Sequence, residues 1–374
     1  MKLEIVNNST WKKVYIKLLN KERIEVLNQE LIFNNKVATI DIDLNNAFYM
    51  YLNNGKRKST EIMYLSENIN QIELRYNSLR KEVDAYFINP NVKYNEVINY
   101  TLKDEKNLFW REDKSKNIHV LLPYNYDKNK SYGLMLMFDG QNIYDKNNVG
   151  NYTLLNDPYG SWQIDVSLTN IKKHFNKEYI IVGIENADFH RMNELMMNKE
   201  FGTFRPLLKG EEYPFVGYLD NLDDFINETV IPFIESKYNI DKDLMGISGS
   251  SCGGNACHYV GLKNLGKYKF ILCYTPASAL YYDECWDKFY KKLDFSKNYS
   301  NLPIFYYFQG AKDDLEKMLY ENNKNLISML LNNGYNKDLI LELIEPTAYH
   351  NETAWRFAYN YMIYKTHELL KKRD

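Results

Sequence analysis

From about residue 93 onward, short apolar runs alternate with stretches of helical periodicity, and no other feature of the chain limits its fold as strongly. Seven runs are predicted strands: residues 117–124, 134–140, 179–186, 244–249, 270–276, 304–310 and 339–345. Several are continuously apolar, as in parallel strands that are covered on both faces. Residues 221–238 have apolar side chains at helical spacing, and Pro232 should kink this helix or mark the point where it resumes. The alternation predicts a doubly wound α/β domain with a mostly parallel sheet.

The first 92 residues follow a different pattern. Short β-type runs such as "KVYIKLL" and "VATIDIDL" are separated by Asn-rich turns, and no stretch there has a convincing helical period. We therefore predict two domains: a small all-β, sandwich-like domain over residues 1–92 and the α/β domain over residues 93–374.

The composition is that of an ordinary globular protein. The chain has 47 Lys and Arg and 49 Asp and Glu, so its net charge is −2 and no basic excess indicates nucleic-acid binding. It contains no run of about 18 apolar residues, so we expect no membrane span. Glu4 and Asn7 interrupt the apolar core that a secretion signal needs, which predicts a cytoplasmic protein. Nothing in these numbers indicates an oligomeric state.

The four cysteines lie in one short region and show no C-x-x-C pairing. Cys252, Cys257 and His258 form a conceivable metal site, but no second cluster of ligands supports it. We therefore expect reduced thiols, no metal and no organic cofactor.

A Gly- and Ser-rich turn lies between a predicted strand and a predicted helix in "LMGISGSSCGGNACHYVGLK", residues 244–263. Its glycines miss the spacing of a dinucleotide-binding turn, and Asn255 stands where a P-loop needs lysine. The pentapeptide "GSSCG" over residues 249–253 instead matches G-x-S-x-G, the nucleophile elbow, with Ser251 at its centre. The other serines lack these flanking glycines. A Gly/Ser turn without chemistry stays the alternative unless the other catalytic groups are present.

A serine nucleophile needs an acid and a histidine base, which follow it in that order in α/β-hydrolases. His350 lies in the loop after the last predicted strand, where a catalytic base belongs, although a cap for the final helix is the alternative. His367 lies within that helix and is predicted to be a packing or surface residue. Asp313 is the predicted acid because it follows the preceding strand, with Asp314 as the alternative. Whichever aspartate is not catalytic should cap the next helix.

The same mechanism needs an oxyanion hole made of backbone N–H groups. Cys252, directly after the nucleophile, is expected to supply one of them. The loop "FDGQN" after an early strand is expected to supply the other, from Gln141 or else from Gly140. Each donor typically lowers the barrier by about 3 kcal/mol. A thiol nucleophile at position 252 would lie off the tip of the elbow, so we do not expect it to attack.

Six motifs in the same order along the chain resemble the putative esterase family of α/β-hydrolases: "FDGQN", "YIIVGIENADFHRMNE", "FINETVIPFIESKYNI", "GSSCGG", "YTPAS" and "AYHNETAW". This family includes feruloyl and acetyl-xylan esterases, enterobactin-type siderophore esterases, S-formylglutathione hydrolases and mycolyltransferases. The resemblance extends from about residue 115 to the end. It implies an α/β-hydrolase fold and supports the nucleophile, the base and Gln141 as oxyanion donor. It also implies an acid three residues past Gly310, which is Asp313.

Family position also implies three substrate-binding residues, Asp139, Trp162 and Arg191. Each has a structural alternative, in which Asp139 shapes its turn, Trp162 lies in the core and Arg191 pairs with Glu194. The chain departs from the family at three places: Cys252 replaces a bulkier apolar residue, Ala348-Tyr349-His350 replaces Gly-Gly-His, and Thr275-Pro276-Ala277 replaces Ser-Pro-Ser. These departures bear on substrate preference more than on the reaction.

Some relatives carry an N-terminal β domain, and "FYMYLNNGK" weakly resembles a starch-binding-type sandwich. Trp11 and Tyr49 are candidates for a sugar platform in a carbohydrate-binding-like domain, and equally for its core.

The predicted function is that of a serine carboxylic-ester hydrolase working through an acyl-enzyme with a Ser-His-Asp triad. The expected substrate is a small-molecule or oligosaccharide ester, either a siderophore ester or an acylated or feruloylated carbohydrate. An acyltransferase on the same fold, or a decayed hydrolase that acts as a binding protein, is the alternative.

Overall fold

The computed structural model describes residues 1–67, 69–88, 95–104, 114–144, 160–202, 204–205, 216–296 and 301–373. The chain divides into two compact units. The first consists of Met1–Asn95, Asn142–Glu178 and Asn351–Asp374, and the second of Glu96–Gln141 and Tyr179–His350. The boundary expected between residues 92 and 93 stays a prediction.

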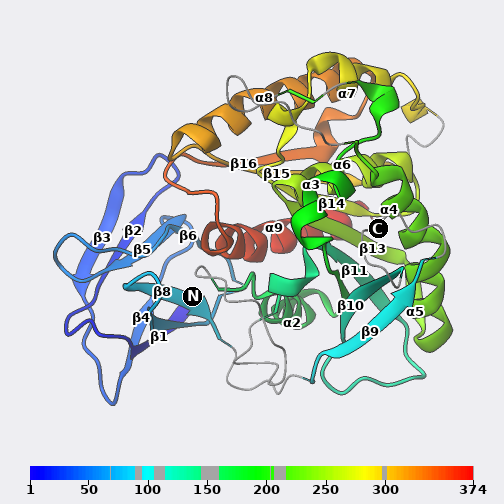
Figure 1. Ribbon diagram of the computed structural model, residues 1–374. Coiled ribbons are helices and arrows are strands. Elements are labelled where there is room, and N and C mark those ends of the chain that lie inside the picture. The colour runs from blue at the N-terminus through cyan, green and yellow to red at the C-terminus, as the bar shows by residue number, and fades with distance from the viewer. Residues whose placement is uncertain are drawn as a thin grey trace. The chain divides into compact units, whose positions relative to one another are not determined.

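The first unit contains two four-stranded sheets, in the orders β4-β1-β7-β8 and β3-β2-β5-β6 (Figure 1). Their strands are β1 (Lys2–Asn8), β2 (Tyr15–Leu19), β3 (Glu25–Glu30), β4 (Val37–Asp41), β5 (Tyr49–Asn53), β6 (Met63–Tyr64), β7 (Gln71–Asn77) and β8 (Glu82–Phe87). The pairs are antiparallel except β1 with β7. Burial alternates along β4, as in a strand with one face on a core. The predicted small all-β region is confirmed, and Trp11 and Tyr49, each 8% exposed, lie in its core.

Two helices also belong to the first unit, α2 (Ile164–Phe175) and α9 (Glu352–Arg373). They pack against each other, and the His367 ring of α9 lies 5.4 Å from the Phe175 ring of α2. His367 is 2% exposed, so it is a packing residue.

An eight-stranded sheet in the order β16-β15-β14-β13-β11-β12-β10-β9 is the core of the second unit (Figure 1). Its strands are β9 (Ile98–Lys103), β10 (Ser115–Leu121), β11 (Tyr132–Phe138), β12 (Tyr179–Ile184), β13 (Ile240–Ser250), β14 (Phe270–Tyr274), β15 (Ile304–Gly310) and β16 (Ile340–Glu345). The six strands from β11 to β16 pair in parallel, whereas β10 pairs antiparallel with β12 and β9. Strands β11, β12, β14 and β15 are buried at every position, which explains their unbroken apolar sequences. The predicted α/β fold is confirmed.

Helices α6 (Cys252–Lys263), α7 (Asp283–Tyr290) and α8 (Asp314–Asn332) connect the strands from β13 to β16. Shorter helical segments are η1 (Gly140–Asn142), η2 (Asp188–His190), α3 (Arg191–Glu194), η3 (Lys199–Phe201), η5 (Ser278–Leu280) and η7 (Lys337–Leu339). Among the described parts of the chain, no helix has both the length and the apolar character needed to cross a membrane.

The helix predicted over residues 221–238 is present in three parts: α4 (Leu219–Phe225), a π-helical segment η4 (Ile226–Val230) and α5 (Ile231–Lys237). Pro232 is the second residue of α5, so it stands where the α-helix resumes. The π-helical segment directly before it shifts the backbone hydrogen bonds, which accommodates a residue that has no N–H to donate.

The carboxyl ends of the parallel strands meet along one edge of the sheet, which is where open α/β sheets bind their ligands. Asp139 follows β11, Ser251 follows β13, Thr275 follows β14 and Gly310 ends β15. His350 lies in the loop after β16. The parallel topology thus explains how residues far apart in the sequence come to share one edge.

Candidate active site

Ser251 forms a sharp turn between β13 and α6. Its backbone has φ 55° and ψ −122°, a conformation that residues other than glycine rarely adopt and that costs about 1–3 kcal/mol. Two hydrogen bonds hold the turn, because the Ser251 N–H donates to the Tyr274 carbonyl at 2.9 Å and the Ser251 carbonyl accepts from the Ala277 N–H at 3.0 Å. Ser248 and Ser250 lie within β13 and are 0% and 4% exposed. Ser251, which is partly exposed, is the serine that the elbow presents.

Three glycines allow the close packing of this elbow. A Cβ on Gly249 would overlap the carbonyl of Gly253, and a Cβ on Gly253 would lie 2.7 Å from an Asp139 carboxylate oxygen. A Cβ on Gly254 would lie 3.1 Å from the Tyr274 carbonyl oxygen. The G-x-S-x-G pattern is therefore a steric requirement of this turn.

Cys252 is the first residue of α6 and is 3% exposed. Burial raises the pKa of its thiol, so the sulfur stays protonated at neutral pH, and Sγ contacts the Met192 Sδ at 3.1 Å. The Cys252 N–H belongs to the start of a 12-residue helix, where N–H groups have no intrahelical partner and the dipole favours negative charge. The main chain of this residue, and not its sulfur, suits the chemistry of the site.

A buried carboxylate lies against His350. The Nδ1 atom of His350 is 2.5 Å from Oε1 of Glu316, and this glutamate lies in the first turn of α8 and is fully buried. The other carboxylate oxygen of Glu316 packs against Gly310, where a Cβ would overlap it. A carboxylate at Nδ1 orients an imidazole so that Nε2 can face a nucleophile, and it stabilises the imidazolium that forms during reaction.

The two aspartates predicted as the acid lie at the start of α8. Asp313 caps this helix, since its Oδ1 accepts a hydrogen bond from the Glu316 N–H at 2.9 Å. The Asp314 side chain is fully exposed and lies 3.6 Å from Lys317 Nζ. The carboxylate in contact with His350 is thus that of Glu316, and not that of Asp313 as expected from the sequence. The spacing Asp-x-x-Glu from Asp313 to Glu316 is a capping-box pattern, in which the first residue caps the helix. This pattern was the sequence signal that Asp313 is the N-cap and that Glu316 is the carboxylate left for His350.

Asp139 is the centre of a cluster beside the elbow. Its carboxylate accepts hydrogen bonds from Arg191 Nε at 2.6 Å, Arg191 Nη2 at 2.8 Å and Asn186 Nδ2 at 2.6 Å. Burial alone would raise the pKa of Asp139, but the Arg191 guanidinium and the Asn186 amide hold it below its usual range. Arg191 Nη2 also lies 3.5 Å from the Ser250 carbonyl oxygen. The pair therefore joins the loops after β11 and β12 to the elbow.

Gln141, the second predicted oxyanion donor, lies in η1 directly after this cluster. Its Oε1 accepts a long hydrogen bond of 3.5 Å from the Asn186 N–H. Gly140 packs against β12, because a Cβ there would overlap the backbone of Gly183. The η1 turn is thus held at the same edge of the sheet as the elbow.

Arg191 pairs with Asp139, whereas Glu194 forms a buried ion pair with Lys116. Trp162 belongs to the first unit, where it is 1% exposed and its ring centroid lies 5.4 Å from that of Trp355. Substrate binding by Asp139, Trp162 and Arg191 stays a prediction.

The residues considered as metal ligands have other partners. His258 is fully buried, and its Nδ1 and Nε2 lie 2.8 and 2.7 Å from the hydroxyls of Tyr307 and Tyr290. Cys257 Sγ contacts the Ile247 carbonyl oxygen at 3.4 Å. Over the described ranges, no group of three or more His, Cys, Asp or Glu could hold a metal ion.

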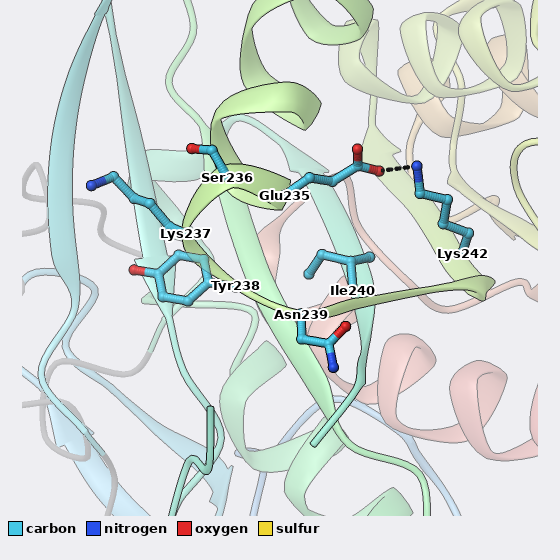
Figure 2. A pocket seen from close by; sticks show the side chains of 7 residues that line it. All are labelled: Glu235, Ser236, Lys237, Tyr238, Asn239, Ile240 and Lys242. Atoms are coloured by element: carbon cyan, nitrogen blue, oxygen red, sulfur yellow. Dashed lines mark ion pairs between the residues drawn. The ribbon is translucent and has the colours of Figure 1, made fainter. Parts of the chain in front are cut away.

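A cavity of about 430 Å³ lies at the opposite end of β13 from Ser251. Figure 2 shows its lining residues, which come from the end of α5, the start of β13 and the two residues between them: Glu235, Ser236, Lys237, Tyr238, Asn239, Ile240 and Lys242. Glu235 and Lys242 form an ion pair at 2.9 Å. Since α/β sheets bind ligands at the carboxyl ends of their strands, this cavity is not the candidate site.

Solved structures with similar folds were found. The siderophore hydrolase EstA from Aspergillus nidulans is 13% identical over 75% of this chain and 99% of its own, with a TM-score of 0.54. The ferulic acid esterase AmCE1/Fae1A from Anaeromyces mucronatus is 18% identical over 74% and 92%, with a TM-score of 0.48. An IroE-like serine hydrolase from Shewanella oneidensis is 14% identical over 74% and 88%, with a TM-score of 0.49. The likeness to EstA shows a shared fold.

A search among curated proteins found no significant match. A family model described as putative esterase matches residues 112–365, which is more than half of the chain. This range contains the elbow, His350 and Glu316. The chain therefore belongs to the putative esterase family and is a carboxylic ester hydrolase.

Proposed function

We propose that the protein hydrolyses carboxylic esters through a Ser251–His350–Glu316 triad, with the N–H groups of Cys252 and Gln141 as the oxyanion hole. The observation that carries this proposal is the 2.5 Å contact between His350 Nδ1 and the buried Glu316 carboxylate. The strained Ser251 turn, at the same edge of the sheet, supports it. Glu316 takes the role that the sequence assigned to Asp313.

In the proposed reaction, Ser251 Oγ attacks the ester carbonyl carbon as His350 Nε2 takes the hydroxyl proton. The negative oxygen of the tetrahedral intermediate accepts hydrogen bonds from Cys252 and Gln141. Collapse of this intermediate expels the alcohol, which takes the proton from His350, and leaves an acyl group on Ser251. A water molecule that gives a proton to His350 then attacks the acyl carbonyl carbon. The bond to Ser251 Oγ breaks as Ser251 takes that proton from His350, and the carboxylic acid leaves. Glu316 stabilises the imidazolium in both steps.

Hydrolysis of p-nitrophenyl acetate and p-nitrophenyl butyrate by the wild type and by Ser251→Ala tests the nucleophile. Loss of a triad nucleophile should lower kcat by about 10⁴-fold or more. Equal rates for the two proteins would show that another residue attacks.

The identity of the acid is tested by a matched pair of variants that each remove one carboxylate. Glu316→Gln should lower kcat by about 10³- to 10⁴-fold, because the neutral amide no longer stabilises the imidazolium. Asp313→Asn should stay within about twofold of the wild type, since Asn caps a helix as well as Asp does. The reverse result would return the acid role to Asp313.

A siderophore ester and an acylated or feruloylated carbohydrate stay the predicted substrates. A panel of catecholate esters, feruloyl esters and acetylated sugars would rank these classes by kcat/KM. An acyltransferase would use the same triad, so the panel should include an alcohol acceptor. Product that carries the acyl group on the acceptor at low alcohol concentration would favour transfer over hydrolysis.

A further inference from the structure

The segment Thr275-Pro276-Ala277, directly after β14, contacts both proposed catalytic residues. On one side, the Ala277 N–H of this segment and the carbonyl of Tyr274, which directly precedes it, bind the main chain of Ser251. On the other side, Thr275 Oγ1 lies 3.3 Å from His350 Nδ1. One short segment thus links the proposed nucleophile to the proposed base.

The backbone of Thr275 is strained. Its φ is 37°, which lies in a region that β-branched residues almost never adopt. The residue is 1% exposed, and its N–H donates to the Phe308 carbonyl of β15 at 2.8 Å. Such a conformation persists only where the surrounding structure imposes it, and it recurs at functional sites. The strain places the Thr275 side chain against His350.

Oxygen atoms of two described residues lie near His350 Nδ1, at unequal distances. Glu316 Oε1 lies at 2.5 Å and Thr275 Oγ1 at 3.3 Å. The Nδ1–H therefore donates chiefly to the carboxylate, and the hydroxyl is a weaker second acceptor. The two oxygens come from α8 and from the end of β14, so together they restrict the rotation of the ring more than either does alone.

We propose that Thr275 is a positioning residue that sets the orientation of the His350 imidazole relative to Ser251. The proposal rests on the function proposed above, in which His350 is the base. Thr275 itself does not touch the reacting atoms and acts through the histidine.

Thr275→Val tests this role, because it removes the hydroxyl and keeps the branched shape. It should lower kcat on p-nitrophenyl acetate by about 3- to 10-fold, the effect of one lost hydrogen bond, with KM little changed. Thr275→Ser restores the hydroxyl and should recover most of this loss. Thr101→Val is the control, since the hydroxyl of Thr101 in β9 contacts Asn117 in β10, at the edge of the sheet opposite β16. If Thr275→Val does not fold, Thr275→Ala gives the same comparison.

Two further readouts separate positioning of the base from support of the elbow. In a His350→Ala background, Thr275→Val should cause no further loss, and an equal loss there would overturn the proposal. In Thr275→Val, the acid limb of the pH profile of kcat/KM should move to lower pH. The lost hydroxyl acceptor destabilises the charged imidazolium more than the neutral ring. Wild-type kcat and an unmoved profile in Thr275→Val would also overturn it. Full activity of Ser251→Ala and His350→Ala would instead overturn the proposed function.

Discussion

At the scale of single residues, Glu316 depends on its immediate neighbours. Its carboxylate has no exposed surface, and a buried charge is stable only where a partner compensates the lost hydration. His350 contacts one carboxylate oxygen, and Gly310 leaves the space that the other occupies. A carboxylate confined in this way has little freedom to move, which suits a group that must orient an imidazole.

Gly310→Ala should displace the acid without removing it. The added Cβ would overlap the Glu316 carboxylate and lie 2.9 Å from the Ala348 carbonyl oxygen, in the loop that carries His350. We expect kcat on p-nitrophenyl acetate to fall by about 10²-fold, the cost of a misplaced catalytic group. In a Glu316→Gln background, Gly310→Ala should lower kcat little further. Equal losses in both backgrounds would show that Gly310 acts elsewhere.

At the scale of elements, helix α8 begins with half of a capping box. The N-cap Asp313 accepts from the Glu316 N–H, as the pattern requires. In a complete box the Glu316 side chain would return to the N-cap, but here it extends to His350. The Asp313 carboxylate therefore stabilises the start of α8, and the Glu316 carboxylate contacts His350 in the candidate site.

Asp313→Ala should cost about 1 kcal/mol in the free energy of unfolding, the usual loss for a removed N-cap. Asp313→Ser should restore that stability, because a serine hydroxyl also accepts from the N3 N–H. Urea unfolding of the wild type and both variants measures the difference. A serine variant as unstable as the alanine variant would mean that the aspartate stabilises α8 through its charge.

At the scale of the whole molecule, two buried histidines link stability to pH. Burial lowers the pKa of His258 to about 3 and that of His367 to about 4, from an ordinary 6.5. Both are therefore neutral in the folded protein. The unfolded chain binds these protons below pH 6.5 and the folded chain does not, so acidification favours unfolding.

The free energy of unfolding should fall as the pH drops below 6.5, and the contribution of His258 should keep falling until about pH 3. Each histidine should contribute a loss of roughly 2 kcal/mol by pH 5. Urea unfolding at pH 7.5 and 5.0 measures this loss. His258→Gln keeps hydrogen-bonding groups for Tyr290 and Tyr307 and should remove about half of the dependence. An unchanged dependence in that variant would contradict the assignment to His258.

The sequence alone predicted seven of the eight strands of the second unit, all but β9, and Ser251 as the nucleophile of the proposed site. Continuous apolar runs mark strands β11, β12, β14 and β15 because both faces of these strands are buried. The elbow is equally local, since the glycines that make room for the turn lie within three residues of Ser251. Patterns of this kind can be read from the chain because each element buries side chains at its own period.

Only the tertiary structure decided which carboxylate meets His350 and which residue pairs with Arg191. Asp313 and Glu316 lie three residues apart on the same helix end, and local spacing does not tell which of them faces the loop after β16. Asp139 and Arg191 lie 52 residues apart and follow different strands, β11 and β12, so no local pattern predicts that they pair. A side chain in a loop takes its direction from the segments packed around it, and those segments meet only when the sheet has formed.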